Sequence, residues 1–260
     1  MNAENKTSKI FYFFILLLII SACQKTKPRY AYFNFSDNIL EEIKINGETN
    51  DNLENGIWSI YDGKANSLIK QGEYEDGLKN GSWIYNQKGV EKTVDWKIIS
   101  ESKKKLKINL PSDWEVIDYD EMYFTATFKS LSAITKNKYF AILKHPLDSA
   151  IQSMDDYHTM SLTELKNKYD LIHSDFFTIK NGNEVHYLTI YFVETEGEQI
   201  MLLNFLTIID NQLYDFIYSS LNEDVELKKS LFSDVILGCF IKNRRVLDPF
   251  KDFVISGKKL

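Results

Sequence analysis

The feature that most constrains the fold of this 260-residue chain is a short aromatic motif that occurs twice. Asn55-Gly56-Ile57-Trp58 recurs 25 residues later as Asn80-Gly81-Ser82-Trp83, and a tyrosine, Tyr61 or Tyr85, soon follows each tryptophan. Asn-Gly favours type I′ hairpin turns because both central residues of such a turn need positive φ, and Asp76-Gly77 gives the same signal. Aromatic residues between tight turns suit a pleated, half-buried surface. The motif therefore predicts short antiparallel strands joined by tight turns.

The aromatic residues of the repeat have two alternative roles. A repeat array generally needs three or more units to bury its own core, so two copies predict rings that pack against each other and a neighbouring element. The alternative is a row of rings that stacks on a ligand. Because the Trp-to-Tyr spacing is three residues in the first copy and two in the second, Tyr61 and Tyr85 should lie on opposite sides relative to their tryptophans. The candidate binding aromatics are Trp58, Tyr61, Tyr74, Trp83 and Tyr85.

Residues 53–89, which read G-x-W-x-x-Y and then G-x-Y-x-D-G-x-x-x-G-x-W, resemble the MORN-type repeat of bacterial exported and antitoxin-like proteins. The resemblance implies a meandering β-sheet used for protein or lipid contact. It implies no individual functional residue. By analogy with other proteins that carry the repeat, it also suggests an immunity or antitoxin-like role.

The amino terminus predicts export. Lys6 and Lys9 precede an uninterrupted apolar run from Ile10 to Ile20, the pattern of a signal peptide. The run has 11 residues, whereas about 20 helical residues are needed to cross a bilayer. Ile20-Ser21-Ala22-Cys23 resembles the bacterial lipobox. That resemblance implies cleavage between Ala22 and Cys23 and acyl chains on Cys23 that together anchor the protein in a membrane; the alternative is a secreted protein without lipid.

The residues around the second cysteine and after the first one refine this expectation. Gln24 follows Cys23 where an aspartate would signal retention in the inner membrane, so the lipobox resemblance points to the outer membrane, facing the periplasm. The basic tether at residues 23–29 leaves surface display open. Once Cys23 is lipidated, Cys239 has no partner for an internal disulfide, and its apolar neighbours predict a buried core residue.

Beyond a charged connector at residues 92–107 the hydrophobic spacing becomes more regular, and we place a domain boundary near residue 100. Helical spacing at 148–168, with Ser161 as N-cap and Glu164 as its capping-box partner, predicts one or two helices. Helical spacing from Asp224 predicts a closing helix that packs on a sheet. Strands are predicted by alternation and turn signals at 106–110, 123–128, 139–143, 176–180, 184–194, 199–209 and 213–218.

This order of elements and the Leu-Pro-x-x-Trp entry at residues 110–114 resemble the PsbP-like fold over about residues 104–242. The resemblance implies a mostly non-enzymatic interaction domain. The expected class is α+β: a short antiparallel meander of two MORN-type repeats, followed by an antiparallel sheet packed by helices. The expected regions are a signal peptide at 1–22, a tether at 23–29, a β-rich region at 30–99, an α+β domain at 100–245 and a C-terminal tail at 246–260.

The sequence shows no catalytic motif. The net charge of −6 argues against a nucleic-acid partner. No two of the four histidines have the spacing of metal ligands on one helix face, so we expect no metal and no cofactor. Asp155 and Asp156, beside Tyr157 and His158, resemble acid–base groups, but adjacent carboxylates at a helix start usually complement the helix dipole.

We therefore expect a membrane-anchored, non-catalytic binding or scaffold module in the cell envelope, with an unidentified envelope protein as partner. The alternative is a small-ligand carrier or an enzyme, with a pocket between the sheet and the helices of the α+β domain.

Overall fold

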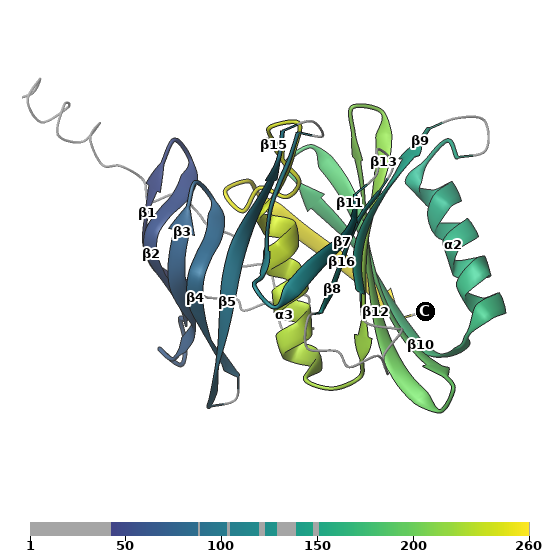
Figure 1. The fold of residues 1–260 in the computed structure, drawn as a ribbon, viewed down its shortest axis with the longest axis horizontal. Helices are drawn as coiled ribbons and strands as arrows, with labels where there is room; N and C mark the ends of the chain where they lie inside the picture. The colour runs from purple at the N-terminus through teal and green to yellow at the C-terminus, as the bar shows by residue number, and fades with distance from the viewer. Residues whose placement is uncertain are drawn as a thin grey trace, which may run out of the picture.

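The computed structural model describes residues 43–87, 89–102, 105–119, 123–128, 139–147 and 151–259. Two eight-stranded sheets dominate this part of the chain (Figure 1). One helix lies between the sheets and another covers the far face of the second sheet, so the layers run sheet, helix, sheet, helix (Figure 1). The predicted signal peptide, Cys23 and the tether lie outside the described residues.

The first sheet, called sheet A, contains the repeat. Strands β1 to β6 are neighbours in chain order and form an antiparallel meander. Strand β14 then pairs with β6, placing Cys239 opposite Ile108, so residues far apart in the chain complete the sheet. In spatial order the strands are β1 (Ile43–Asn50), β2 (Leu53–Asp62), β3 (Leu68–Glu75), β4 (Leu78–Gln87), β5 (Val90–Glu101), β6 (Leu106–Pro111), β14 (Cys239–Ile241) and β15 (Arg244–Arg245).

The second sheet, called sheet B, is built mainly from long hairpins. Its spatial order is β16 (Phe253–Lys259), β10 (Asp170–Asn181), β11 (Glu184–Thr195), β12 (Glu198–Ile209), β13 (Gln212–Leu221), β9 (Tyr139–Pro146), β8 (Tyr123–Phe128) and β7 (Trp114–Tyr119). The turns between β10, β11 and β12 place Gly182 and Gly197 at positive φ, the conformation that tight hairpin turns need. Strand β16 comes from the predicted C-terminal tail and pairs with β10.

Both predicted helical regions are helices, α2 (Met154–Lys168) and α3 (Val225–Leu237). The predicted cap of α2 is wrong, because Ser161 lies inside the helix. Ser153 is the N-cap, and its hydroxyl accepts a hydrogen bond from the Asp156 backbone N–H at 3.2 Å. Asp155 and Asp156 occupy the first turn, where their charge complements the helix dipole.

The expected α+β class is wrong. Within the described ranges, sixteen strands accompany only two helices, and every strand pairing is antiparallel. Helix α3 is not a cover on a single sheet, because its apolar residues contact both sheets at once. The repeat is likewise not a short separate meander but part of an eight-stranded sheet.

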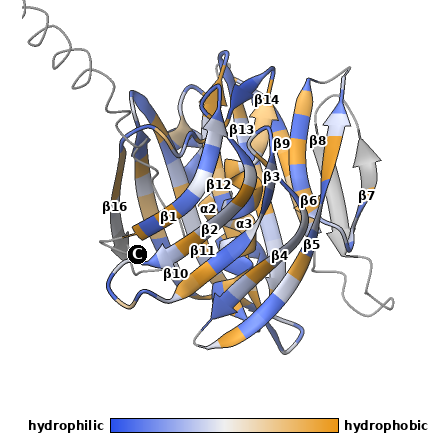
Figure 2. Cartoon of the chain, turned by 90° about the vertical axis from the view of Figure 1, so that its left-hand side faces the viewer, coloured by the Kyte–Doolittle hydropathy of each residue, from blue (hydrophilic) through white to orange (hydrophobic). Residues whose placement is uncertain are grey.

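One large apolar core joins sheet A, α3 and sheet B. It runs from Trp58 and Trp83 in sheet A, past Phe232 of α3, to Phe205 and Phe216 in sheet B. Hydrophilic and hydrophobic residues alternate along strands of sheet A, which turns one face toward α3 (Figure 2). Two smaller apolar clusters lie on the other face of sheet B, beneath α2.

Candidate functional site

The two tryptophans of the repeat are held in the same way. Trp58 Nε1 donates to the Glu48 carbonyl at 2.9 Å, and Trp83 Nε1 donates to the Glu73 carbonyl at 2.9 Å. A Cβ atom added to Gly47 or Gly72 would lie 2.3 Å from the indole ring of Trp58 or Trp83, so both glycines are needed for this close approach. The structural repeat therefore includes a Gly-Glu pair on the preceding strand as well as Asn-Gly-x-Trp.

The predicted turns at Asn55-Gly56 and Asn80-Gly81 are wrong, although both glycines have the positive φ expected in such turns. Gly56 and Gly81 have φ of +69° and +63°, yet both lie inside strands, β2 and β4. There the pairing register shifts, and three residues stand opposite one glycine of the neighbouring strand. The Asn-Gly pairs thus form β-bulges that turn the tryptophans inward. Asp76-Gly77 is a turn between β3 and β4, as predicted.

The candidate aromatics face the core rather than solvent. Trp58, Tyr74, Trp83 and Tyr85 are 0–4% exposed, and Tyr74 packs edge-on against both tryptophans, with ring centroids 5.7 and 4.8 Å apart. Tyr61 is half-buried, whereas Tyr85 is buried in the same core as Trp83. These four rings therefore belong to the main apolar core.

A buried charge cluster, which we call the Asp234 centre, lies beside these rings. Asp234 of α3 forms ion pairs with Lys70 Nζ of β3 at 2.5 Å and Lys79 Nζ of β4 at 3.2 Å. Tyr85 OH donates to Asp234 Oδ2 at 2.7 Å. All four side chains are buried, and Lys79 Nζ also lies over the ring of Trp83. The centre links sheet A to α3.

The charges of the Asp234 centre determine its protonation. Burial alone would raise the pKa of Asp234, but the positive charges of Lys70 and Lys79 outweigh it, and the pKa is lowered. Burial lowers the pKa of Lys79 well below its usual value, Asp234 opposes the shift, and Lys70 adds to it. One carboxylate thus stays ionised between two amines. An ionised carboxylate held between two buried lysine side chains is typical of a permanent structural contact.

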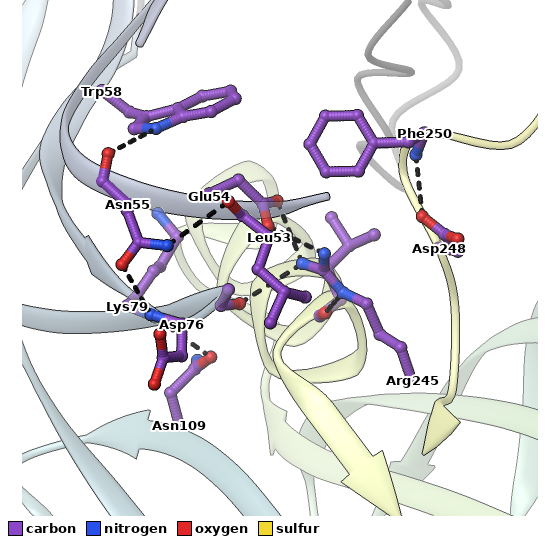
Figure 3. A network of polar contacts seen from close by, with 12 residues as sticks. Leu53, Glu54, Asn55, Trp58, Asp76, Lys79, Asn109, Arg245, Asp248 and Phe250 are labelled. Atoms are coloured by element: carbon purple, nitrogen blue, oxygen red, sulfur yellow. Dashed lines mark hydrogen bonds and ion pairs between the residues drawn. The ribbon is translucent and has the colours of Figure 1, made fainter. Parts of the chain in front are cut away.

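A second buried ion pair connects β2 to β15. Two guanidinium nitrogens of Arg245 contact the two carboxylate oxygens of Glu54 at 2.8 and 3.0 Å, and Nε donates to the Leu237 carbonyl at 2.6 Å (Figure 3). A bidentate pair of this kind fixes distance and orientation together. Glu54 is fully buried. With the Asp234 centre, this pair holds the repeat strands against α3 and the strands that follow it.

A third polar cluster, the Asp215 centre, lies between sheet B and α2. Tyr157 of α2 donates from its hydroxyl to Asp215 Oδ2 at 2.9 Å and lies 3.0 Å from His145 Nε2. Asn204 Nδ2 donates to Asp215 Oδ1, while Asn204 Oδ1 is buried without a hydrogen-bond partner among the described residues. Tyr157 is the one buried residue of α2.

Asp215 differs from Asp234 because no ion pair within the described residues involves it. Burial raises the pKa of Asp215 to about 7, and the hydrogen bonds from Tyr157 and Asn204 oppose only part of that shift. Burial lowers the pKa of His145. The pKa of Tyr157 is raised by burial and then by Asp215. Perturbed pKa values in one cluster mark the Asp215 centre as the candidate functional site.

The other residues considered from the sequence stay apart from this centre. Asp155 accepts a hydrogen bond from Tyr187 OH at 2.9 Å, and His158 Nε2 lies 3.1 Å from Thr189 Oγ1. Cys239 is buried, as predicted, and burial raises the pKa of its thiol. In the described part of the chain, no three His, Cys, Asp or Glu side chains are grouped as a metal site.

One surface groove reaches toward the Asp234 centre. It has a volume of about 640 Å³ and lies between β3 to β5 and the start of α3. Ile69, Val90 and Val225 supply apolar lining, and Tyr85 also lines the groove. The ion pair between Lys92 and Asp224, at 2.7 Å, joins the two sides.

The described chain is an antiparallel two-sheet protein with a helix between its sheets. No protein-family model matches the sequence, and no curated protein matches it. None of the helices in the described ranges is both long and apolar enough to cross a bilayer.

Solved structures similar to this chain include a PsbP protein. The cyanobacterial PsbP of Synechocystis is 16% identical with a TM-score of 0.42, over 56% of this chain and 92% of its own. A mutant of the protein Mog1 is 9% identical with a TM-score of 0.39, over 57% of this chain and 97% of its own. LpqN, involved in cell envelope biogenesis of Mycobacterium tuberculosis, is 9% identical with a TM-score of 0.37, over 63% and 91%. Likenesses at this level assign no function.

Proposed function

We propose that the protein is a lipid-anchored protein of the cell envelope whose two-sheet body is a non-catalytic binding module. The anchor is supported by the signal-peptide pattern that ends at Ile20-Ser21-Ala22-Cys23. Anchoring by several acyl chains makes membrane attachment effectively permanent.

The anchor is tested by growing cells with a radiolabelled or clickable fatty acid. Cys23→Ala should abolish labelling and release the protein from membranes. Cys239→Ala is the matched control and should keep the label, because Cys239 is buried in the core. Labelling that survives in the Cys23→Ala chain would refute the lipid anchor.

The binding role is supported by one observation: the repeat turns its aromatic rings inward and is fixed to α3 and β15 by buried ion pairs. Sheet A therefore presents a fixed outer surface. Its first bulge exposes Ile57, an apolar side chain that is 70% exposed, and the second bulge exposes Ser82 at the corresponding position. Ile57 has the highest exposed fraction of the large apolar side chains in the described ranges, so it is the position at which we probe this surface.

The binding role is tested by placing a photo-crosslinking amino acid at Ile57 in intact cells. Val254, which is 58% exposed on sheet B, is the matched control. A single envelope protein captured from position 57 and not from 254 would support binding through sheet A. The same products from both positions, or none from 57, would contradict it.

The groove beside Tyr85 favours a second candidate, a carrier of a small amphiphilic molecule. The full chain would be purified from cells and analysed by native mass spectrometry for a bound molecule. Val90→Trp narrows the rim and should remove that molecule. A chain with no bound mass, or with the same bound mass after the substitution, would rule out a carrier that uses this groove.

A further inference from the structure

Helix α2 contributes only one fully buried side chain to its contact with sheet B; Met154, Leu162 and Leu165 pack there partly buried. Tyr157 alone is buried among its residues, whereas nine residues of α3 are buried. The apolar contact between α2 and sheet B is also divided into two clusters. Leu206 and Leu213 form a small apolar cluster near its start, and Tyr191, Val193 and Ile200 form another toward its end.

Between the two clusters, α2 covers the Asp215 centre. The side chains that face Asp215 are Tyr157 from α2, His145 and Tyr139 from β9, Tyr191 from β11 and Asn204 from β12. Of these only His145 can carry a positive charge. Asn204 Oδ1 stays unpaired, and a partly satisfied buried network weakens the closed arrangement.

We infer that α2 is a pH-controlled latch on the outer face of sheet B, closed when Asp215 is protonated and loosened when Asp215 is ionised. An ionised Asp215 beneath α2 is a buried charge with two hydrogen-bond donors and no cation, which is unfavourable. When α2 moves away, water solvates the carboxylate. Closing is therefore coupled to the uptake of a proton.

Protonation also changes the hydrogen bonds that the Asp215 carboxyl group can form. Tyr157 has one hydroxyl proton; when it donates that proton to ionised Asp215, its oxygen can accept from His145 Nε2–H. When Asp215 is protonated, its own O–H can donate to the Tyr157 oxygen, and the Tyr157 hydroxyl can turn toward an unprotonated His145 Nε2. Both arrangements keep the three side chains hydrogen bonded, but only the second leaves them without a buried charge.

The direction of the pH effect follows from linkage. The pKa of Asp215 is about 7 when α2 is closed and about 3.9 for a solvated aspartate, so closing weakens as the pH rises through that range and changes little above it. His145 acts in the opposite direction, because burial lowers its pKa and its protonation at lower pH favours opening. Replacing His145 removes this opposing effect, and the test chains also carry His158→Gln, because that histidine contacts Thr189 of sheet B from α2 itself.

The test is hydrogen–deuterium exchange of the full chain in detergent micelles, with rates corrected for intrinsic exchange. In a chain with His145→Gln and His158→Gln, protection of the α2 amides should fall about tenfold between pH 6 and pH 8. Adding Asp215→Asn should make α2 protection independent of pH. Amides of α3 are the internal reference and should not change.

A conservative variant tests the latch in a chain that should still fold. Tyr157→Phe keeps the ring and removes a hydrogen bond that lowers the pKa of Asp215, so the midpoint of the α2 transition should move to higher pH. The latch is refuted if α2 protection in the chain with both histidines replaced does not depend on pH, if the dependence survives Asp215→Asn, or if α3 loses protection together with α2. The latch depends neither on the lipid anchor nor on the binding partner.

Discussion

Asp234 and Asp215 are both buried, and their pKa values move in opposite directions. Asp234 lies between two lysines, which keep it ionised despite burial. Asp215 has only neutral donors, and burial raises its pKa to about 7. The comparison teaches that burial alone does not decide the charge of a core carboxylate; the cations that the neighbouring strands supply decide it.

The two helices differ in the same way: α3 carries Asp234, whereas α2 covers Asp215. Helix α3 lies between two sheets, contacts both, and carries its own charged anchor. Helix α2 has a sheet on one side only, and its polar contacts with that sheet, made by Asp155, Tyr157 and His158, include no ion pair among the described residues. We therefore expect substitutions around α3 to affect the whole fold and substitutions around α2 to have smaller, local effects.

The largest expected effect is that of Asp234→Ala, which leaves the ammonium groups of Lys70 and Lys79 without their carboxylate. Removing one partner of a buried pair typically costs about 3–5 kcal/mol. Urea unfolding of the full chain, followed by tryptophan fluorescence, would measure the loss. Replacing Lys70, Lys79 and Asp234 together with apolar residues is the control and should restore much of the stability. A loss below about 1 kcal/mol for Asp234→Ala would break the contrast with Asp215.

Trp83→Ala comes next, with an expected loss of about 3 kcal/mol or more, because the ring is fully buried in the main core. The same unfolding experiment applies. Ile57→Ala, on the exposed bulge, serves as the control and should change stability by less than about 0.5 kcal/mol. Equal effects of the two substitutions would show that the rings of the repeat do not belong to the core.

Gly72→Ala should cost about 1–3 kcal/mol, since its new Cβ would lie 2.3 Å from the indole of Trp83. In a double-mutant cycle, the cost should largely disappear in a Trp83→Ala background, which removes the ring. Gly47→Ala should behave similarly against Trp58. Additive effects in this cycle would contradict the close contact between glycine and indole.

Tyr157→Phe should have the smallest effect on global unfolding, about 1 kcal/mol, the usual net contribution of one hydrogen bond. The measurement is made at pH 5 to 6, where Asp215 is mostly protonated. A loss as large as that of Asp234→Ala would mean that α2 is as deeply integrated into the fold as α3.

The strands of sheet B could be predicted from the sequence because turn residues and alternation are local signals. Those signals place β11, β12 and β13 within a few residues of their bounds. The cap of α2 could not be chosen correctly, since Ser153 and Ser161 each have an acidic residue three positions on, and the glutamate of the second pair matches the capping box better. The choice depends on where α2 meets the sheet.

The Asn-Gly pairs show a different limit. The positive φ of their glycines was predictable, but whether such a pair makes a turn or a bulge depends on the partner strand. A repeated Gly-Glu pair, Gly47-Glu48 and Gly72-Glu73, carries the missing information at the same 25-residue offset. Aligning the two copies further upstream would have revealed it.

The two carboxylate centres could be predicted only in part. Lys70 shares a strand face with Tyr74, and Asp215 shares one with Leu213 and Ile217. The sequence therefore indicated that each charged side chain lies on an apolar face. The residues that contact Lys70 and Asp215 could not be predicted from the sequence. Lys70 and Asp234 are separated by 164 positions, and only the folded topology brings them together.

The return of β14 to sheet A has a consequence for how the chain is made. Cys239 pairs with Ile108, 131 positions earlier (239 minus 108), and Arg245 reaches Glu54 across 191 positions. A chain synthesised from its amino terminus therefore carries one unpaired edge of β6 until β14 has emerged. Such long-range pairings fold slowly and leave a strand edge open to other chains meanwhile. Strands β14 and β15 thus complete the first sheet that the ribosome began.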